Sequence, residues 1–204
     1  MPRIRSIAVA ATVLLLLGLL AGCAAAPSTT TSGAPSATPS APTAASGPEV
    51  TITTSKGEIV VTLDAEKAPV TAGNFIKLVK AGFYDGLLVH RVEPGFVVQA
   101  GDPVTKGMTP DALQDAVAVG AVGGGGPGWS IPLEKTGLLH DRGVIAMART
   151  NDPDSAGSQF YITLDAAHHL DGAYAVFGAV TRGMDVVDRL QVGDAIVSAT
   201  VTKD

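Results

Sequence analysis

Arg91 and Gln99 are the side chains in this sequence whose setting most clearly suggests chemistry. Both lie in the stretch 90–102, HRVEPGFVVQAGD, which is typical of two short β-strands joined by a turn at Pro94-Gly95. Valine and phenylalanine surround them, and arginine is seldom buried unless it has a partner. A guanidinium held among apolar groups therefore indicates a site that presents fixed N–H donors to a ligand.

This stretch and its neighbours carry a family resemblance. The pattern His-Arg-x-x-x-Gly-Phe-x-x-Gln-x-Gly-Asp resembles the active-site strand pair of the cyclophilins, the peptidyl-prolyl cis–trans isomerases. Each further motif is weak alone, but together they extend the resemblance over residues 49–204. In the order that the family has them, they are GFYDG at 82–86, GGPGW at 125–129, IPLE at 131–134, RGVIAMAR at 142–149, GSQFYI at 157–162 and LDGAYAVFG at 170–178.

The resemblance implies a reaction without covalent chemistry. Rotation about a peptide bond has a barrier of about 18–20 kcal/mol, and X-Pro isomers exchange over roughly tens to hundreds of seconds. A protein that speeds this exchange needs no nucleophile, metal or cofactor, because it has only to stabilise the twisted amide and the lone pair on its nitrogen. By resemblance Arg91 donates to that nitrogen, and Gln99 helps to hold Arg91 and the substrate carbonyl.

The resemblance also implies which residues bind the substrate. Strand alternation puts Phe96 and Val97 on opposite faces, so the assignment of Phe96 follows from the resemblance and not from the pattern. The implied proline pocket consists of Phe96, Val97, Tyr161 and Leu170; Ala148, Arg149 and Gln159 match the strand that pairs with the substrate backbone, and Tyr174 matches the pocket rim.

The sequence departs from the family pattern at three of these positions. Val97 replaces a frequent methionine, which predicts a wider pocket. Arg149 stands where many relatives have asparagine, although the family's contact there is largely through the backbone. His169 replaces a tryptophan of relatives that bind cyclosporin tightly, so we expect cyclosporin to bind weakly.

Other candidate sites are weaker. His168 and His169 suggest a metal, but adjacent strand residues point to opposite faces and no third ligand is evident. Ser158 lacks the Gly-x-Ser-x-Gly setting of hydrolases. No Gly-Lys-Ser/Thr follows Gly123–Gly126, so a phosphate loop is not predicted, and 151–154 (NDPD) is typical of a turn. We expect no metal and no cofactor.

Composition narrows the class of protein. The 204 residues are 46% hydrophobic, which suits one globular domain with some additional sequence. A net charge of −5 gives no support to a nucleic-acid partner. Cys23 is the only cysteine, so neither an intramolecular disulfide nor a cysteine zinc site can form.

The first 48 residues indicate export and anchoring. Arg3 and Arg5 precede the apolar run 7–21, which is too short to span a bilayer and is typical of a secretory signal. The run ends in Leu-Ala-Gly-Cys, which resembles the lipobox of bacterial lipoproteins. We therefore expect residues 1–22 to be a signal peptide and Cys23 to carry a lipid anchor to the membrane. Residues 23–48, nearly all Ala, Pro, Ser, Thr and Gly, are expected to be a disordered tether.

The periodicity of residues 49–204 predicts an antiparallel β-barrel capped by two α-helices. The resemblance implies that this barrel is closed and eight-stranded, with one helix at each open end. The helices are expected at 69–81 and 183–191, with a further short helix in an insertion at 104–122 whose role is left open. The strands are expected at 49–63 (a hairpin), 87–92, 96–100, 143–147, 159–164, 174–180 and 195–202.

Three hypotheses about function follow. The first is an exported, lipid-anchored, monomeric prolyl isomerase that acts on proline-containing polypeptides. The second is a peptide-binding or chaperone module that uses the same groove without significant turnover. The third, a purely structural envelope lipoprotein, leaves Arg91 and Gln99 without a function. A structural ion pair between Arg91 and a carboxylate on the barrel wall is the alternative to its catalytic role.

Overall fold

The computed structural model of the protein describes residues 47–204, so the expectations for residues 1–46, Cys23 included, lie outside it. The helices of this part are α1 (Pro69–Lys80), α2 (Pro110–Ala118) and α3 (Met184–Val187), with 3₁₀ turns η1 (Pro103–Thr105) and η2 (His168–Leu170). No helix in this range is long and apolar enough to cross a bilayer. The strands are β1 (Glu49–Thr54), β2 (Gly57–Leu63), β3 (Arg91–Glu93), β4 (Val97–Ala100), β5 (Val144–Met147), β6 (Phe160–Thr163), β7 (Val176–Arg182) and β8 (Ile196–Lys203).

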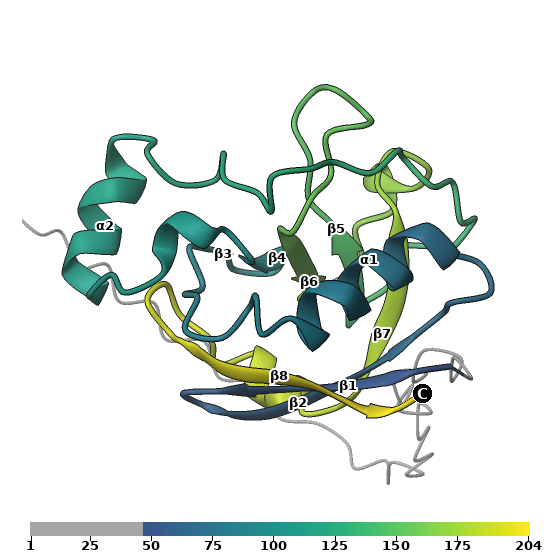
Figure 1. The fold of residues 1–204 in the computed structure, drawn as a ribbon, viewed down its shortest axis with the longest axis horizontal. Helices are drawn as coiled ribbons and strands as arrows, with labels where there is room; N and C mark the ends of the chain where they lie inside the picture. Colours follow the sequence, from purple (N-terminus) through teal and green to yellow (C-terminus); the bar gives the residue numbers. More distant parts are fainter. Residues whose placement is uncertain (1–46) are drawn as a thin grey trace, which may run out of the picture. The chain divides into compact units, whose positions relative to one another are not determined.

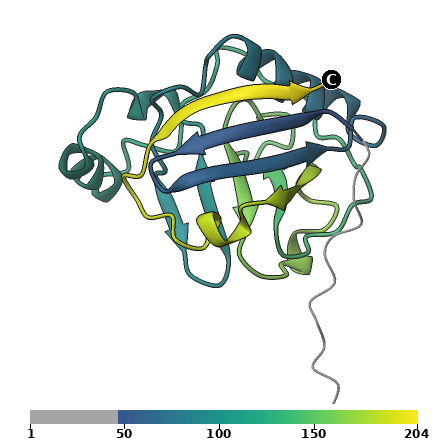
Figure 2. The ribbon, with the colours of Figure 1, turned by 90° about the horizontal axis from the view of Figure 1, so that it is seen from below.

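The eight strands form one antiparallel sheet in the order β3-β4-β6-β5-β7-β2-β1-β8. The sheet is strongly curved, so that β8, β1 and β2 run across the strands β4, β6 and β5 behind them (Figure 2). The mainly β architecture with accompanying helices is therefore as predicted. Side chains from both halves of the sheet meet between them and form the larger of two apolar clusters.

The predicted closed barrel is wrong in one respect, because the sheet is open between its edge strands β3 and β8. The chain just before β3 is joined to the start of β8: segments 86–89 and 193–196 share four backbone hydrogen bonds and an isolated bridge between Leu88 and Ala195. The strand predicted at 87–92 is shorter in the structure, because β3 begins only at Arg91. The Leu88 amide donates to Thr105 Oγ1 (3.0 Å) and not to a neighbouring strand.

Helix α1 carries the aromatic centre of the core and runs along β7 and β8 (Figure 1). The ring of Phe75 lies 5.1 Å from that of Tyr84, 5.4 Å from Phe160 on β6 and 5.2 Å from Phe177 on β7. All four side chains are buried. Phe75 thus joins the helix to two strands that are far from it in sequence.

The N-terminus of α1 is capped by a distant residue. Pro69 suits the first turn, but Ala68 before it has no side chain that can accept a hydrogen bond. The carboxylate of Glu134 instead accepts from the amides of Val70 (3.0 Å) and Thr71 (2.9 Å). Negative charge at a helix N-terminus is favourable, so the segment 131–134 fixes α1 from outside.

The second predicted helix, 183–191, is only one turn long. Regular α-helix ends at Val187. The Asp188 amide still bonds back four residues, but those of Arg189 and Leu190 bond back only three. The Asp194 carboxylate then accepts from the Gln191 amide (2.8 Å) and turns the chain toward β8. The apolar spacing that predicted a helix at 183–191 does mark the buried side of this segment. Tight turns of the 3₁₀ type, however, replace the helix after its first turn.

The insertion is tied down at its base. Its predicted helix forms as α2, capped by Thr109, and buries only Leu113. Asp102, which is completely buried, accepts from the amides of Gly123 (2.6 Å) and Gly125 (3.2 Å) and so brings the two ends of the insertion together. A Cβ at Gly125 would lie 2.1 Å from the Asp102 carboxylate, so only glycine fits this approach.

Candidate active site

The outer face of β4, β6 and β5 forms the floor of the candidate site. Alternate side chains of these strands point into the barrel core, among them Val98, Ile145 and Ile162. The residues between them form a second apolar cluster on the other face. That cluster consists of Val97, Val144, Ala146, Tyr161 and Val176, with Phe96, Leu138, Ala148, Leu170 and Tyr174 packed against it.

A cavity of about 260 Å³ opens above this floor. Each of the nine residues that line it is among the predicted site residues, although they come from five separate stretches of the chain. The tertiary structure thus brings together what the motifs only placed in order. The lining residues are Arg91, Phe96, Val97, Gln99, Ala148, Arg149, Tyr161, Leu170 and Tyr174.

Arg91 presents its guanidinium to the cavity and to solvent. It is the first residue of β3, directly opposite Gln99 on β4, and its side chain is 46% exposed. Its contacts are long: Nη1 lies 3.5 Å from Gln99 Oε1, and Nε lies 3.5 Å from Glu93 Oε1. The guanidinium therefore points away from the barrel interior, and its N–H donors are weakly engaged in the absence of a ligand.

Gln99 belongs to a short relay of amides. Its Nε2 donates to Gln159 Oε1 (3.0 Å), and Gln159 Nε2 donates to the carbonyl of Gly125 (2.8 Å). Gln159 lies next to the cavity and not in its lining. The relay orients the side-chain carbonyl of Gln99 toward Arg91. It leaves the second hydrogen of the Gln99 amide nitrogen free for a ligand carbonyl.

Arg149 is held rigidly by main-chain carbonyls. Its Nε and Nη2 donate to the carbonyl of Ala173 (3.0 and 2.8 Å), and its Nη1 donates to that of Thr150 (2.7 Å). The guanidinium also lies 4.5 Å from the ring centre of Tyr174. The side chain therefore fastens the segment that carries Tyr174 to the end of β5.

Phe96 and His169 form one edge of the site. Strand β4 begins at Val97, so Phe96 lies in the preceding turn, where strand alternation does not apply. Phe96 and Val97 can therefore both line the cavity. The ring of His169 stacks on Phe96, with 5.5 Å between the ring centres. His169 is thus adjacent to the cavity without lining it.

The sequence analysis missed His140 and Asp171. His140 is completely buried, with Nδ1 2.8 Å from Asp171 Oδ1 and Nε2 2.9 Å from the hydroxyl of Tyr161 in the cavity floor. Burial lowers the pKa of His140, so its ring is neutral near pH 7. A tyrosine on a buried strand was the available signal, because its hydroxyl needs a partner, but nothing local identifies that partner.

The alternative chemistries find no geometric support among residues 47–204. His168 and His169 diverge, since His168 faces Asp171 (3.2 Å) and His169 stacks on Phe96. No group of three or more potential metal ligands occurs in this range. The buried Ser158 hydroxyl donates to the Gly101 carbonyl (2.7 Å), which does not suit a nucleophile.

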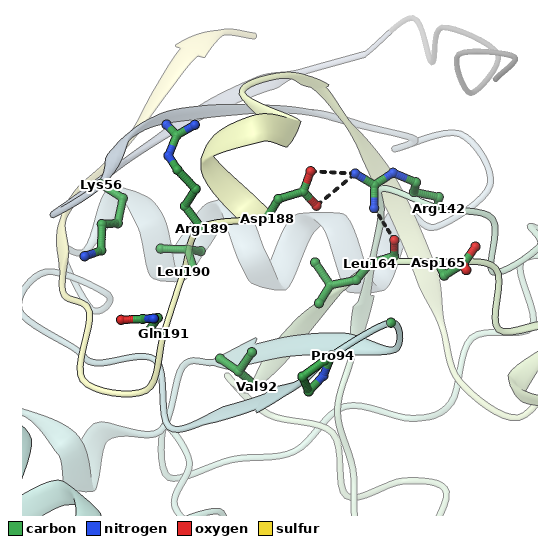
Figure 3. Close-up of a pocket in the computed structure, with 11 residues that line it drawn as sticks. Lys56, Val92, Pro94, Arg142, Leu164, Asp165, Asp188, Arg189, Leu190 and Gln191 are labelled. Carbon is green, nitrogen blue, oxygen red and sulfur yellow. Dashed lines mark hydrogen bonds and ion pairs between the residues drawn. The ribbon is translucent and has the colours of Figure 1, made fainter. Parts of the chain in front are cut away.

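A larger hollow of about 740 Å³ lies beside the turn Pro94-Gly95 and the end of α3. Figure 3 shows Arg142 reaching Asp188 and the carbonyl of Leu164 in this hollow. Its other basic side chains, Lys56 and Arg189, also pair with carboxylates. Each basic side chain of the hollow is therefore already paired with a carboxylate. In the smaller cavity, by contrast, Arg149 is paired only with main-chain carbonyls.

The family model for cyclophilin type peptidyl-prolyl cis-trans isomerases (Cyclophilin type peptidyl-prolyl cis-trans isomerase/CLD) matches residues 49–204. The chain belongs to the cyclophilin family. The match covers every strand and helix described above, and nine of the eleven residues that the resemblance assigned to catalysis and substrate binding line the cavity, the exceptions being Gln159 and His169.

Proteins similar to this cyclophilin are named as peptidyl-prolyl isomerases. The chain is 41% identical over 149 residues to peptidyl-prolyl cis-trans isomerase A of Dickeya dadantii, which covers 69% of this chain and 70% of that protein. It is 37% identical over 159 residues to a probable peptidyl-prolyl cis-trans isomerase of Brucella suis, covering 72% and 79%. The predicted enzyme class, a peptidyl-prolyl cis–trans isomerase, is thus confirmed.

Solved structures show the same fold. A cyclophilin type peptidyl-prolyl cis-trans isomerase of Cryptosporidium parvum, crystallised in the presence of the dipeptide Ala-Pro, matches with a TM-score of 0.64 and 25% identity. The match covers 76% of this chain and 99% of that one. Cyclophilin AquaCyp293 from Hirschia baltica matches with a TM-score of 0.62, covering 75% and 73%.

Proposed function

We propose that this cyclophilin accelerates X-Pro rotation in exported polypeptides, with Arg91 as the catalytic residue and Cys23 as a lipid anchor. The observation that carries the catalytic part is the position of the Arg91 guanidinium: it lines a cavity with an apolar floor, and its donors are held only by contacts of 3.5 Å. A substrate can replace such weak contacts at little cost.

The proline ring of a substrate would occupy the cavity formed by Phe96, Val97, Tyr161 and Leu170. The Ala-Pro dipeptide present with the Cryptosporidium relative supports a ligand of this size. With the ring held, the X-Pro bond lies beside Arg91 and Gln99. The residues Ala148, Arg149, Gln159, His169 and Tyr174 would then surround the flanking peptide.

Catalysis in this site requires no bond to be made or broken. As the amide twists, its nitrogen loses conjugation and gains a lone pair that accepts a hydrogen bond, which the planar ground state does not offer. An Arg91 N–H directed at this nitrogen stabilises the transition state more than the bound substrate. Gln99, oriented by Gln159, donates its free amide hydrogen to the substrate carbonyl as that carbonyl rotates.

An exchange experiment on a short proline peptide tests this function. We expect catalytic amounts of the purified protein to broaden and merge the cis and trans NMR signals of the peptide. A peptide that binds, seen as shifted signals, without faster exchange would instead support the binding or chaperone module. No binding and no exchange would refute both.

We further propose that the protein is exported and anchored through Cys23, at the end of the apolar run 7–21. Two or more acyl chains hold a protein on a membrane stably, whereas one does not. The replacement Cys23→Ser is expected to move the protein from the membrane fraction to the soluble exported fraction. Labelling with a radioactive fatty acid gives the second readout, since the label should be lost with the cysteine. Continued membrane association of C23S would contradict the anchor.

Weak binding of cyclosporin and a monomeric state complete the proposal. His169 stacks on Phe96 and offers a smaller ring than the tryptophan that it replaces. We therefore expect the isomerase activity to persist at nanomolar cyclosporin, and inhibition in that range would contradict the expectation. Sedimentation of the exported protein without its lipid tests the monomer.

A further inference from the structure

We propose that His140 is a positioning residue for the proline cavity: by bridging Tyr161 and Asp171, it fixes the floor of the cavity relative to its wall. The inference deepens the proposed function and depends on it for the identity of the ligand. It is carried by a chain of three side chains behind the cavity lining, in which Tyr161 and His140 are buried and Asp171 is partly exposed.

The bridge has one consistent arrangement of hydrogens. The Asp171 carboxylate can only accept, so Nδ1 of His140 must donate to it across 2.8 Å. In a neutral ring Nε2 is then an acceptor, so the Tyr161 hydroxyl donates to it across 2.9 Å. The hydrogen bonds from His140 outweigh the effect of burial and lower the pKa of Asp171, which keeps this carboxylate ionised.

Each end of the bridge is a part of the cavity. Tyr161 lies in the middle of β6, pairs with Gln99 in the sheet register and forms part of the floor. Asp171 directly follows Leu170, which forms part of the wall. A side chain that holds both ends determines the width between the floor and the wall.

The wall has attachments that do not involve the imidazole. The segment 168–174 is a 3₁₀ turn followed by turns, and its far end is held by Arg149 through the Ala173 carbonyl. Near its beginning, the main chain of His140 accepts from the Ala167 amide (2.7 Å) and donates to Asp171 (2.8 Å). These main-chain bonds do not need the imidazole, so replacing the ring should leave the segment in place and change only its fit against Tyr161.

The replacement His140→Phe removes both ring nitrogens but keeps an aromatic ring stacked beside Tyr161, whose centre lies 6.1 Å away. It leaves the Tyr161 hydroxyl buried without a partner, and the ring must shift to find one. Because the proline ring contacts the floor in both the ground state and the transition state, the KM for a proline peptide should rise about tenfold with kcat nearly unchanged.

The second change in the test removes the orphaned group. Tyr161→Phe alone is expected to raise KM about threefold, since it leaves Nε2 of His140 without a donor. In the double variant H140F/Y161F no polar group is left unpaired at this point, so KM should return to within about threefold of the wild-type value. This recovery separates positioning from a general loss of structure, in which the two changes would add.

His168→Phe is the matched control, because His168 also bonds to Asp171 (3.2 Å) but is half exposed and does not reach Tyr161. Its KM should equal that of the wild type. An unchanged KM in H140F would overturn the proposal. This holds even if kcat falls, because a lower kcat at unchanged KM means only that a smaller fraction of the protein is folded. If H140F does not fold, a Y161F variant with wild-type KM overturns it equally.

The same variants keep this inference distinct from the proposed function. Wild-type turnover reports on the function, whereas the differences between variants report on His140. If the wild type binds a proline peptide without turnover, the dissociation constant measured by NMR titration replaces KM, and the same order of affinities is expected.

Discussion

The replacement Arg91→Ala is expected to lower kcat/KM for a proline peptide about 100- to 1,000-fold, with most of the loss in kcat. The Arg91 guanidinium lines the cavity and contacts Gln99 and Glu93 only at 3.5 Å, so it is available to a substrate. The interaction lost is one that only the twisted amide makes, which is why binding should change little. A protease-coupled assay and an NMR titration measure the two quantities separately.

Arg91→Lys is the control for charge. It keeps the positive charge but loses the planar set of donors, so it should retain only a small part of the activity. The folding of both variants should be unaffected, because the Arg91 side chain is 46% exposed and its one ion pair lies on the surface. Rate enhancement that survives largely intact in R91A would exclude the proposed mechanism.

The replacement Phe75→Ala is expected to reduce the free energy of unfolding by about 3–5 kcal/mol. The Phe75 ring is completely buried and contacts three aromatic rings, on β6, on β7 and at Tyr84, so its removal leaves a cavity between α1 and both strands. Urea denaturation followed by fluorescence or circular dichroism measures the change.

Ile76→Ala, one residue further along α1, is the matched control. Ile76 is only partly buried and packs on the edge of the core, so the loss should be less than half of that for Phe75. A loss below about 1 kcal/mol in F75A would mean that the cluster relaxes to fill the space and is not the centre of the core.

The motifs and the periodicity predicted much of this site. Alternation along 97–100, 144–147 and 160–163 separates the side chains into a core face and an outer face, and the outer face proves to be the cavity floor. That separation depends only on the two-residue period of a strand, so it can be read from the sequence. The helix at 69–80 could also be predicted from the sequence, because Pro69 and the helical spacing of the apolar residues are local signals.

Other features depend on contacts between residues far apart in the chain. The cap of α1 by Glu134, the closure of the insertion by Asp102 and the opening of the sheet at β3 all follow from such contacts. The shortening of the helix at 184–187 has the same origin, since Asp194 turns the chain before the periodicity ends. No local propensity encodes these partners.

The sequence by itself determined which residues line the cavity, because family motifs and strand alternation are properties of neighbouring positions. Only the tertiary structure decided how those residues are held. A buried hydroxyl must be satisfied, but Tyr161 finds its partner in His140, and His140 finds Asp171, through the folding of three segments onto one another. Hydrogen-bond geometry between such segments is set by packing, which no spacing along the chain specifies.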